Sequence, residues 1–341
     1  MVNKIRFSIP YNGDIELVRW AIHTGQVAEV YFSGVGRFDY SASHEVISRY
    51  SQQELRAVIK LCADQGVGRN LLMNKNILFF ESIKGILDGL NKLNNFGGVT
   101  TVTISDPLVV PYIKNKFPQI NIQTSVFMHI DTVNKVRECW KMGINTFCLG
   151  VSVNRDAIEL EKIKKLKKSC PGMSVKLLAN HGCYANCFYA LRHEDWAELS
   201  DFRKESLDEN DKYLLGQHIN PHRCAYKLIN LSDEIKRPFI RPEDVCFYEE
   251  HGFADQVKIA YRIDTSSVLR MKLEAYFGRS YRGDLFKLVP SSGLFPRRHR
   301  AYILRNELFP KKFIQKTSCC GNCCEKCHYC EDVSLRVFQG R

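Results

Sequence analysis

The sequence lacks the segments that carry a chain to or through a membrane. No run of about 18 consecutive apolar residues occurs, so no transmembrane helix is predicted. The N-terminus, Met1-Val-Asn-Lys-Ile5, has no apolar core followed by a cleavage site, so no secretion signal is predicted. We therefore expect a cytoplasmic protein, in which 45% apolar residues allow a sizeable core.

Two short motifs of common enzyme classes are also missing. No His-Glu-x-x-His motif of zinc proteases is present. Gly34-Val-Gly36 follows a predicted strand, but Asp39 stands where a dinucleotide-binding fingerprint has its third glycine. These absences disfavour a zinc protease and an open doubly wound sheet that binds a dinucleotide.

Cysteine, by contrast, is abundant. The chain has 14 cysteines, and six of them lie between Cys319 and Cys330. Disulfides rarely persist in the cytosol, so clustered cysteines in such a protein indicate metal ligands rather than a disulfide framework.

Eight predicted strands alternate with helices through most of the 341 residues. The strands are predicted at 4–10, 27–33, 69–73, 99–104, 121–128, 146–151, 174–179 and 254–261. Helices are predicted at 16–23, 51–65, 78–93, 132–142, 156–168 and 266–277, with Ser51 as an N-cap. Strands that alternate with helices form parallel sheets, and eight units predict an α/β fold of the (β/α)8 TIM-like barrel type.

Two segments depart from this alternation. An insertion at 181–250 begins where the seventh strand ends, which is the barrel face that carries active sites. After the barrel, taken as 1–290 with its insertion, residues 291–341 form a basic, cysteine-rich tail. The tail has ten Lys and Arg against four Asp and Glu, half of the chain's net charge of +12. Its charge indicates an acidic partner such as RNA, or a solvated surface.

The first candidate metal centre lies at the start of the insertion. Cys183 and Cys187 have three residues between them at a strand exit, and Cys224 follows in the same insertion. Together they could bind three irons of a [4Fe-4S] cluster. Zinc is the alternative metal, since it takes cysteine and histidine ligands. The nearby histidines are His181, His193 and His222. The non-metal alternative is buried free thiols.

The second candidate metal centre is the tail. Four ligands can be drawn from its six cysteines, and our choice is Cys320, Cys324, Cys327 and Cys330. The spacing does not exclude Cys319 or Cys323. A second iron–sulfur cluster and zinc are equally compatible with it, as are a redox and a structural role. Surface thiols without a metal are the alternative.

Cys320, Cys324 and Cys327 also have the spacing of radical S-adenosylmethionine enzymes. In that family the motif follows an early barrel strand, and an aromatic residue precedes the third cysteine. Here the motif follows the barrel, and Lys326 precedes the third cysteine. In the insertion, Ala190 stands where a third cysteine would be needed. A radical mechanism is therefore disfavoured.

The segment Phe239-Ile-Arg-Pro-Glu-Asp244 predicts the start of a short helix, with Pro242 in the first turn. Arg241 could hold a carboxylate or phosphate in a bidentate grip. The alternative is a structural ion pair at the helix start.

Together these segments resemble the U-32 peptidase family, also called collagenase-like proteases. The resemblance is carried by Leu178-Ala-Asn-His-Gly-Cys183 with Cys187, and by Ile240-Arg-Pro-Glu-Asp244 with Tyr248. Val257-Lys-Ile-Ala-Tyr-Arg262 looks like the family's last strand. The resemblance implies a barrel with a cysteine-bound [4Fe-4S] cluster, in the region of Cys183, Cys187 and Cys224. Several members hydroxylate ubiquinone precursors or RNA bases without molecular oxygen, and others are named proteases.

We therefore expect an iron–sulfur oxidoreductase that hydroxylates, or modifies by a related redox step, a small metabolite, cofactor precursor or RNA base. Arg192, His193 and Arg241 are the candidates for orienting an anionic group of the substrate. A U-32-type peptidase is the second hypothesis, and a zinc-stapled RNA-binding or assembly protein is the third. An electron donor is an expected partner, and a homo- or hetero-oligomer is compatible with the sequence.

Overall fold

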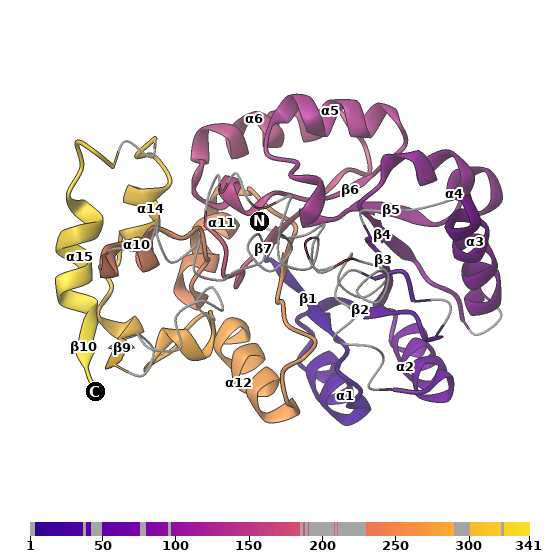
Figure 1. The fold of residues 1–341 in the computed structure, drawn as a ribbon, viewed down its shortest axis with the longest axis horizontal. Coiled ribbons are helices and arrows are strands. Elements are labelled where there is room, and N and C mark those ends of the chain that lie inside the picture. Colours follow the sequence, from indigo (N-terminus) through magenta and orange to yellow (C-terminus); the bar gives the residue numbers. More distant parts are fainter. Residues whose placement is uncertain are drawn as a thin grey trace.

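The computed structural model contains a closed barrel of eight parallel strands, with helices between them on the outside (Figure 1). It describes residues 4–36, 39–41, 50–75, 80–94, 97–184, 187, 190, 208, 210, 230–289, 301–321 and 324–341. The strands pair in chain order, and the first closes the barrel against the eighth. The predicted (β/α)8 fold is confirmed.

The barrel strands follow the apolar segments of the sequence. They are β1 (Arg6–Pro10), β2 (Val27–Ser33), β3 (Gly68–Met73), β4 (Thr101–Ile104), β5 (Asn121–Thr124), β6 (Thr146–Cys148), β7 (Ser174–Leu178) and β8 (Gln256–Lys258). The predicted strands at β5 and β6 are too long, because 3-10 helices (Val126–Met128 and Val151–Arg155) follow these strands closely. The short strands leave room for loops at the carboxyl ends, where the candidate site lies.

The outer helices are α1 (Ile15–His23), α2 (Gln52–Asp64), α3 (Phe80–Asn94), α4 (Val110–Lys116), α5 (Val133–Lys141), α6 (Ala157–Lys168) and α12 (Ser266–Phe277). Four of them, α1, α2, α5 and α6, begin at a residue whose side chain caps the first turn. Ser51 caps α2 in a capping box with Glu54, as predicted in part from the sequence. The helix α4 is not predicted by the pattern, since it has only seven residues and Pro111 in its first turn. None of the described helices is both long and apolar enough to span a membrane.

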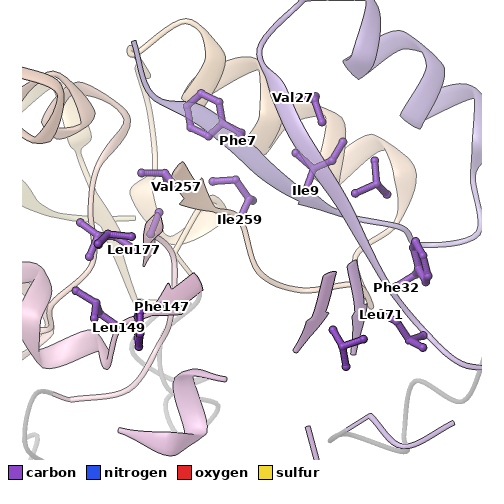
Figure 2. Packing of buried hydrophobic residues seen from close by; sticks show 14 of the residues in the cluster. Phe7, Ile9, Val27, Phe32, Leu71, Phe147, Leu149, Leu177, Val257 and Ile259 are labelled. Carbon is purple, nitrogen blue, oxygen red and sulfur yellow. The ribbon is translucent and has the colours of Figure 1, made fainter. Parts of the chain in front are cut away.

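Alternate residues of the strands face opposite sides of the barrel wall. Phe7 lies 5.1 Å from Phe277 of α12, measured between ring centroids, so its side chain packs on the helical layer. Figure 2 shows this layer, in which Phe32, Phe147 and Val257 are labelled among other buried apolar side chains. Burial of such side chains stabilises the fold by about 1.5–3 kcal/mol each.

The inner face of the wall is polar at mid-height. Six side chains from six strands form a hydrogen-bonded layer: Ser8, Glu29, Asn70, Thr103, Gln123 and Lys176. Lys176 forms a buried ion pair with Glu29, and its Nζ also donates to Gln123 Oε1 at 2.6 Å. A polar layer is tolerated inside a barrel when its groups are satisfied, and here the contacts close on one another.

The tail packs against the barrel through a second apolar cluster. Its elements are α14 (Phe313–Thr317), α15 (Tyr329–Val337) and a two-stranded sheet of β9 (Tyr302–Leu304) and β10 (Phe338–Gly340). Phe313 and Val337 are buried in a cluster with Phe239, which precedes α11 (Val245–His251). Figure 1 shows α15 beside α10 (Leu231–Lys236), a helix of the insertion.

Candidate active site

A cavity of about 290 Å³ lies at the mouth of the barrel, where the carboxyl ends of the strands meet. It is lined by Tyr31, Leu72, Asn74, Ser125, Val126, Phe127, Leu178, His181, Lys258, Ala260, Tyr261, Arg262 and Ile263. Leu178 and Lys258 are the last residues of β7 and β8. TIM-barrel enzymes build their active sites at this face, so the cavity is the candidate active site.

The charge of this cavity is one-sided. Two of its lining residues, Lys258 and Arg262, are basic, and none of the described residues that line it is an aspartate or a glutamate. Such a lining favours a ligand with a negative charge.

Lys258 contacts an aromatic ring at the cavity. Its Nζ lies 4.3 Å from the ring centroid of Tyr31, whose hydroxyl donates to the Ile259 carbonyl at 2.7 Å. Lys258 forms no ion pair with any described residue. Burial lowers the pKa of Lys258, the charges of Lys176 and Arg262 lower it as well, and the charge of Glu29 opposes them. The ammonium therefore faces the cavity with an aromatic ring against it, and no carboxylate of the described residues lies at ion-pair distance.

The chain after β8 has an unusual backbone conformation. Tyr261 has a φ of 77°, in the left-handed region that non-glycine residues rarely adopt. Lys272 supports this turn, since its Nζ lies 4.9 Å from the Tyr261 ring centroid and 2.6 Å from Asp264 Oδ2. The turn carries both Tyr261 and Arg262 into the cavity lining. Burial raises the pKa of Tyr261 to about 12, so its hydroxyl is a proton donor at neutral pH.

The exit of β7 is fixed by Asn180. Its Oδ1 accepts from the backbone N–H of Ala260 at 2.6 Å, and its Nδ2 donates to the Leu288 carbonyl at 3.3 Å. These bonds tie the start of the insertion to the segment that follows β8. The loop that carries the candidate cysteines therefore begins beside the cavity.

His181 lies on this loop and lines the cavity. The backbone N–H of Cys183 donates to its Nδ1 at 3.2 Å, which leaves the proton on Nε2. Burial, together with the cations of Arg237 and Lys258, lowers the pKa of His181 to about 4. The imidazole is thus neutral at pH 7, and its contact with Cys183 is to the backbone N–H.

Cys183 and Cys187 differ in exposure from the cysteines of the barrel wall and outer helices. Both are half-buried, whereas Cys62, Cys148 and Cys170 are buried. The backbone N–H of Cys183 contacts His181, which lines the cavity, so Cys183 lies near the cavity. Partial exposure is typical of a thiol that binds a metal rather than of a thiol packed in the core.

The other predicted residues of this region are not described. Cys224, Arg192 and His193 lie outside the described residues. Among the residues that are described, no three cysteine, histidine or acidic side chains are placed to hold one metal ion. The [4Fe-4S] site at Cys183, Cys187 and Cys224 therefore stays a prediction.

Arg241 is placed away from the cavity. Its guanidinium forms a bidentate pair with Asp244, with Nε–Oδ2 and Nη2–Oδ1 distances of 2.9 and 2.6 Å. It also stacks on the tail, 4.7 Å from the Phe309 ring centroid and 5.6 Å from that of Phe313. The residue is buried and is not part of the cavity lining. The pair with Asp244 is the structural ion pair that the sequence analysis gives as the alternative for Arg241. A role of Arg241 in orienting a substrate stays a prediction, without support from the cavity lining.

In the tail, Cys330 is half-buried beside Arg155. Burial is the main cause that raises the pKa of Cys330 to about 11, and the charge of Arg155 opposes it. Cys327 is half-buried, and Cys323 lies outside the described residues. The described tail residues alone form no metal-binding group, so the tail metal site also stays a prediction.

Comparison with known proteins identifies the family. Residues 13–250, more than half of the chain, match the sequence profile of peptidase family U32. The chain belongs to family U32. The uncharacterized protease MJ1657 of Methanocaldococcus jannaschii is 27% identical over 250 residues, which cover 73% of this chain and 69% of that protein.

A solved structure supports the fold of this U32 barrel. The U32 peptidase Mk0906 superposes with a TM-score of 0.50 and 15% sequence identity, over 75% of this chain and 92% of that chain. At this identity the likeness concerns the barrel and not its chemistry. The family resemblance predicted from the motifs is confirmed.

Sequence reasoning about this U32 chain missed Lys258 and its contact with Tyr31. A signal was present, because a lysine between Val257 and Ile259 interrupts an apolar strand. In a closed barrel, such a residue faces the interior or its mouth. Only the distance to Tyr31 shows which of these positions Lys258 occupies.

Proposed function

We propose that this U32 protein is an iron–sulfur enzyme that acts on a substrate bound in the cavity at the barrel mouth. The reaction is an oxygen-independent hydroxylation or a related redox modification of a small metabolite, cofactor precursor or RNA base. The observation that carries the proposal is the pair of half-buried cysteines, Cys183 and Cys187, on the loop that leaves β7 beside this cavity.

The donor set fits an iron–sulfur cluster. Cys183 and Cys187 supply two thiolates, and Cys224 is the predicted third. A [4Fe-4S] cluster held by three cysteines supplies redox chemistry at an iron that is open to substrate. The tail would carry a second cluster or zinc on Cys320, Cys324, Cys327 and Cys330.

The chain's own residues would bind and orient the substrate. Lys258 and Arg262 favour an anionic group, and Tyr261 provides a hydroxyl that stays protonated at neutral pH. The neutral His181 can donate from Nε2 into the same space. Arg192 and His193 remain candidates for the same role. An electron donor is a required partner of a redox step.

A peptidase is the second candidate, and the name of the relative from Methanocaldococcus jannaschii favours it. A Cys183 nucleophile would need a base that contacts its thiol. His181 instead accepts from the Cys183 backbone, and its low pKa makes it a weak base. Within the described residues, the peptidase hypothesis therefore lacks a Cys–His pair at this loop.

Metal content tests the proposal. The full chain is purified without oxygen and analysed for iron, sulfide and zinc, together with Cys183→Ala, Cys187→Ala and Cys320→Ala. Cys170→Ala is the matched control, because Cys170 is a buried thiol at the amino end of the loop before β7, away from the cavity lining. We expect a brown protein that loses iron and sulfide in Cys183→Ala and Cys187→Ala but not in Cys170→Ala.

Other outcomes select the alternatives. Colourless protein with stoichiometric zinc, lost in Cys320→Ala, would contradict the proposal and support the zinc-stapled RNA-binding or assembly protein. Cleavage of a peptide that survives iron chelation would support the peptidase. Loss of iron in Cys320→Ala alone would indicate that the tail cysteines, and not those of the barrel, bind the cluster.

A further inference from the structure

The cavity at the barrel mouth has two kinds of lining, which come from different sides of the barrel. Lys258 and Arg262 belong to β8 and the segment after it. Val126 and Phe127 belong to the 3-10 helix after β5, three strands away around the closed barrel. A ligand that fills this space meets positive charge from one part of the wall and apolar surface from another.

Lys258 differs from other cations in the barrel in what neutralises it. Lys176 pairs with Glu29, and Lys272 pairs with Asp264. Lys258 has the ring of Tyr31 at 4.3 Å and no ion pair with a described residue. The charge of Glu29 also acts on Lys258, but without an ion-pair contact. Holding a partly desolvated ammonium without a carboxylate in direct contact is costly, and a bound anion would offset that cost.

The volume of about 290 Å³ limits the size of the ligand. Ligand pockets for drug-sized molecules span about 300–1,000 Å³, so this cavity holds a small metabolite rather than a folded peptide or a nucleic-acid strand. A flat apolar body suits the surface of Val126 and Phe127, which contributes no charge.

We propose that the cavity binds a small organic acid, with its carboxylate against the Lys258 ammonium and a planar apolar body against Val126 and Phe127. The identification of this acid as the substrate rests on the proposed function. The binding of the acid does not, because the residues that carry it are not cluster ligands.

A pair of probes that differ in charge tests the proposal. Phenylacetate and its neutral analogue phenylacetamide are titrated into the full chain by calorimetry, at concentrations up to about 10 mM, a range that detects weak binding. We expect phenylacetate to bind and phenylacetamide to bind about 10- to 100-fold more weakly, as for the loss of one charged hydrogen bond.

Three variants assign the charge effect to Lys258. Lys258→Met is expected to remove the preference for the carboxylate, and Lys258→Arg is expected to keep part of it. Lys141→Met is the control, because Lys141 is an exposed residue of α5 that pairs with Glu138. Circular dichroism checks that each variant is folded. The probe pair tests the wild-type chain even if Lys258→Met does not fold.

Equal affinity for the two probes, or no binding of either, would overturn the inference. So would a preference for phenylacetate that Lys258→Met leaves unchanged. Iron and sulfide are measured on the same samples. A preference for the carboxylate in protein without iron would support the acid site and reject the iron–sulfur proposal. Protein that holds a cluster but shows no such preference would support the iron–sulfur proposal and reject the acid site.

Discussion

Two lysines on neighbouring strands of the barrel have opposite surroundings. Lys176 of β7 lies at mid-height, where it is fully buried and bound to Glu29 and Gln123. Lys258 of β8 pairs in register with Leu178, two residues nearer to the mouth. It faces the cavity, with the Tyr31 ring as its contact.

The different surroundings give the two lysines different roles, one in the stability of the barrel and one in ligand binding. A buried lysine whose charge is met inside the protein stabilises one arrangement of the barrel, and its removal leaves an uncompensated carboxylate. A lysine at the mouth without a carboxylate has charge available for a ligand. Position along the barrel axis, and not residue type, decides which role a lysine has.

The largest expected effect on stability comes from replacing Lys176, the buried lysine at mid-height. Lys176→Met should lower the free energy of unfolding by about 3–5 kcal/mol, because Glu29 stays buried without its counter-ion. Urea denaturation followed by circular dichroism measures this change. In the double variant Glu29→Gln with Lys176→Met, the loss should be smaller than the sum of the two single losses. An additive result would show that the two side chains do not act as a pair.

The second largest expected effect is a dependence of the free energy of unfolding on pH, which comes from Glu29 in the same polar layer of the barrel. Burial alone would raise the pKa of Glu29, but the ion pair with Lys176 and the hydrogen bonds from Ser8 and Asn70 lower it overall. A carboxyl whose folded pKa is lowered contributes stability above its ordinary pKa of 4.5, and this stability is lost as pH falls through the folded value. The slope is about 1.4 kcal/mol per pH unit for one proton.

This acid dependence is measured as the free energy of unfolding between pH 7 and pH 3, in the wild type and in Glu29→Gln. The difference between the two proteins should shrink as the pH falls. A constant difference across this range would show that Glu29 keeps its ordinary pKa in the folded state.

The smallest expected effect on stability comes from replacing Lys258, the lysine at the barrel mouth. Lys258→Met should change the free energy of unfolding by no more than about 1 kcal/mol, because the lost cation–π contact with Tyr31 is offset by relief of the desolvated charge. Urea denaturation beside Lys176→Met gives the comparison directly. A loss as large as that of Lys176→Met would mean that the fold depends on the Lys258 charge, and the contrast between the two lysines would fail.

Much of the barrel could be predicted from local pattern. The strand at Val27–Ser33 and the helix at Ser266–Phe277 are found at the predicted bounds, because each is a continuous apolar or amphipathic segment. The bounds of β8 could not be predicted, because only Gln256–Lys258 of the apolar segment 254–261 finds strand partners on both sides.

The candidate site was predictable in its place and less so in its residues. The sequence predicts Cys183 and Cys187 just after the seventh strand, and in the structure the loop that carries them follows the end of β7. Their role as cluster ligands stays a prediction. Arg241 was a candidate for its guanidinium, but Asp244 lies within reach three residues later and takes that group. The choice between an internal and an external partner depends on packing against the tail, which spacing does not reveal.

The sequence by itself determined the eight βα units, the family and the clustering of cysteines, because these are properties of neighbouring residues. Only the tertiary structure decided which charges are met inside the barrel. Glu29 and Lys176 are 147 residues apart, and ring closure brings them together. The same closure leaves Lys258 at the mouth without an ion pair to any carboxylate of the described residues, because the distance between side chains on different strands is set by register and barrel geometry.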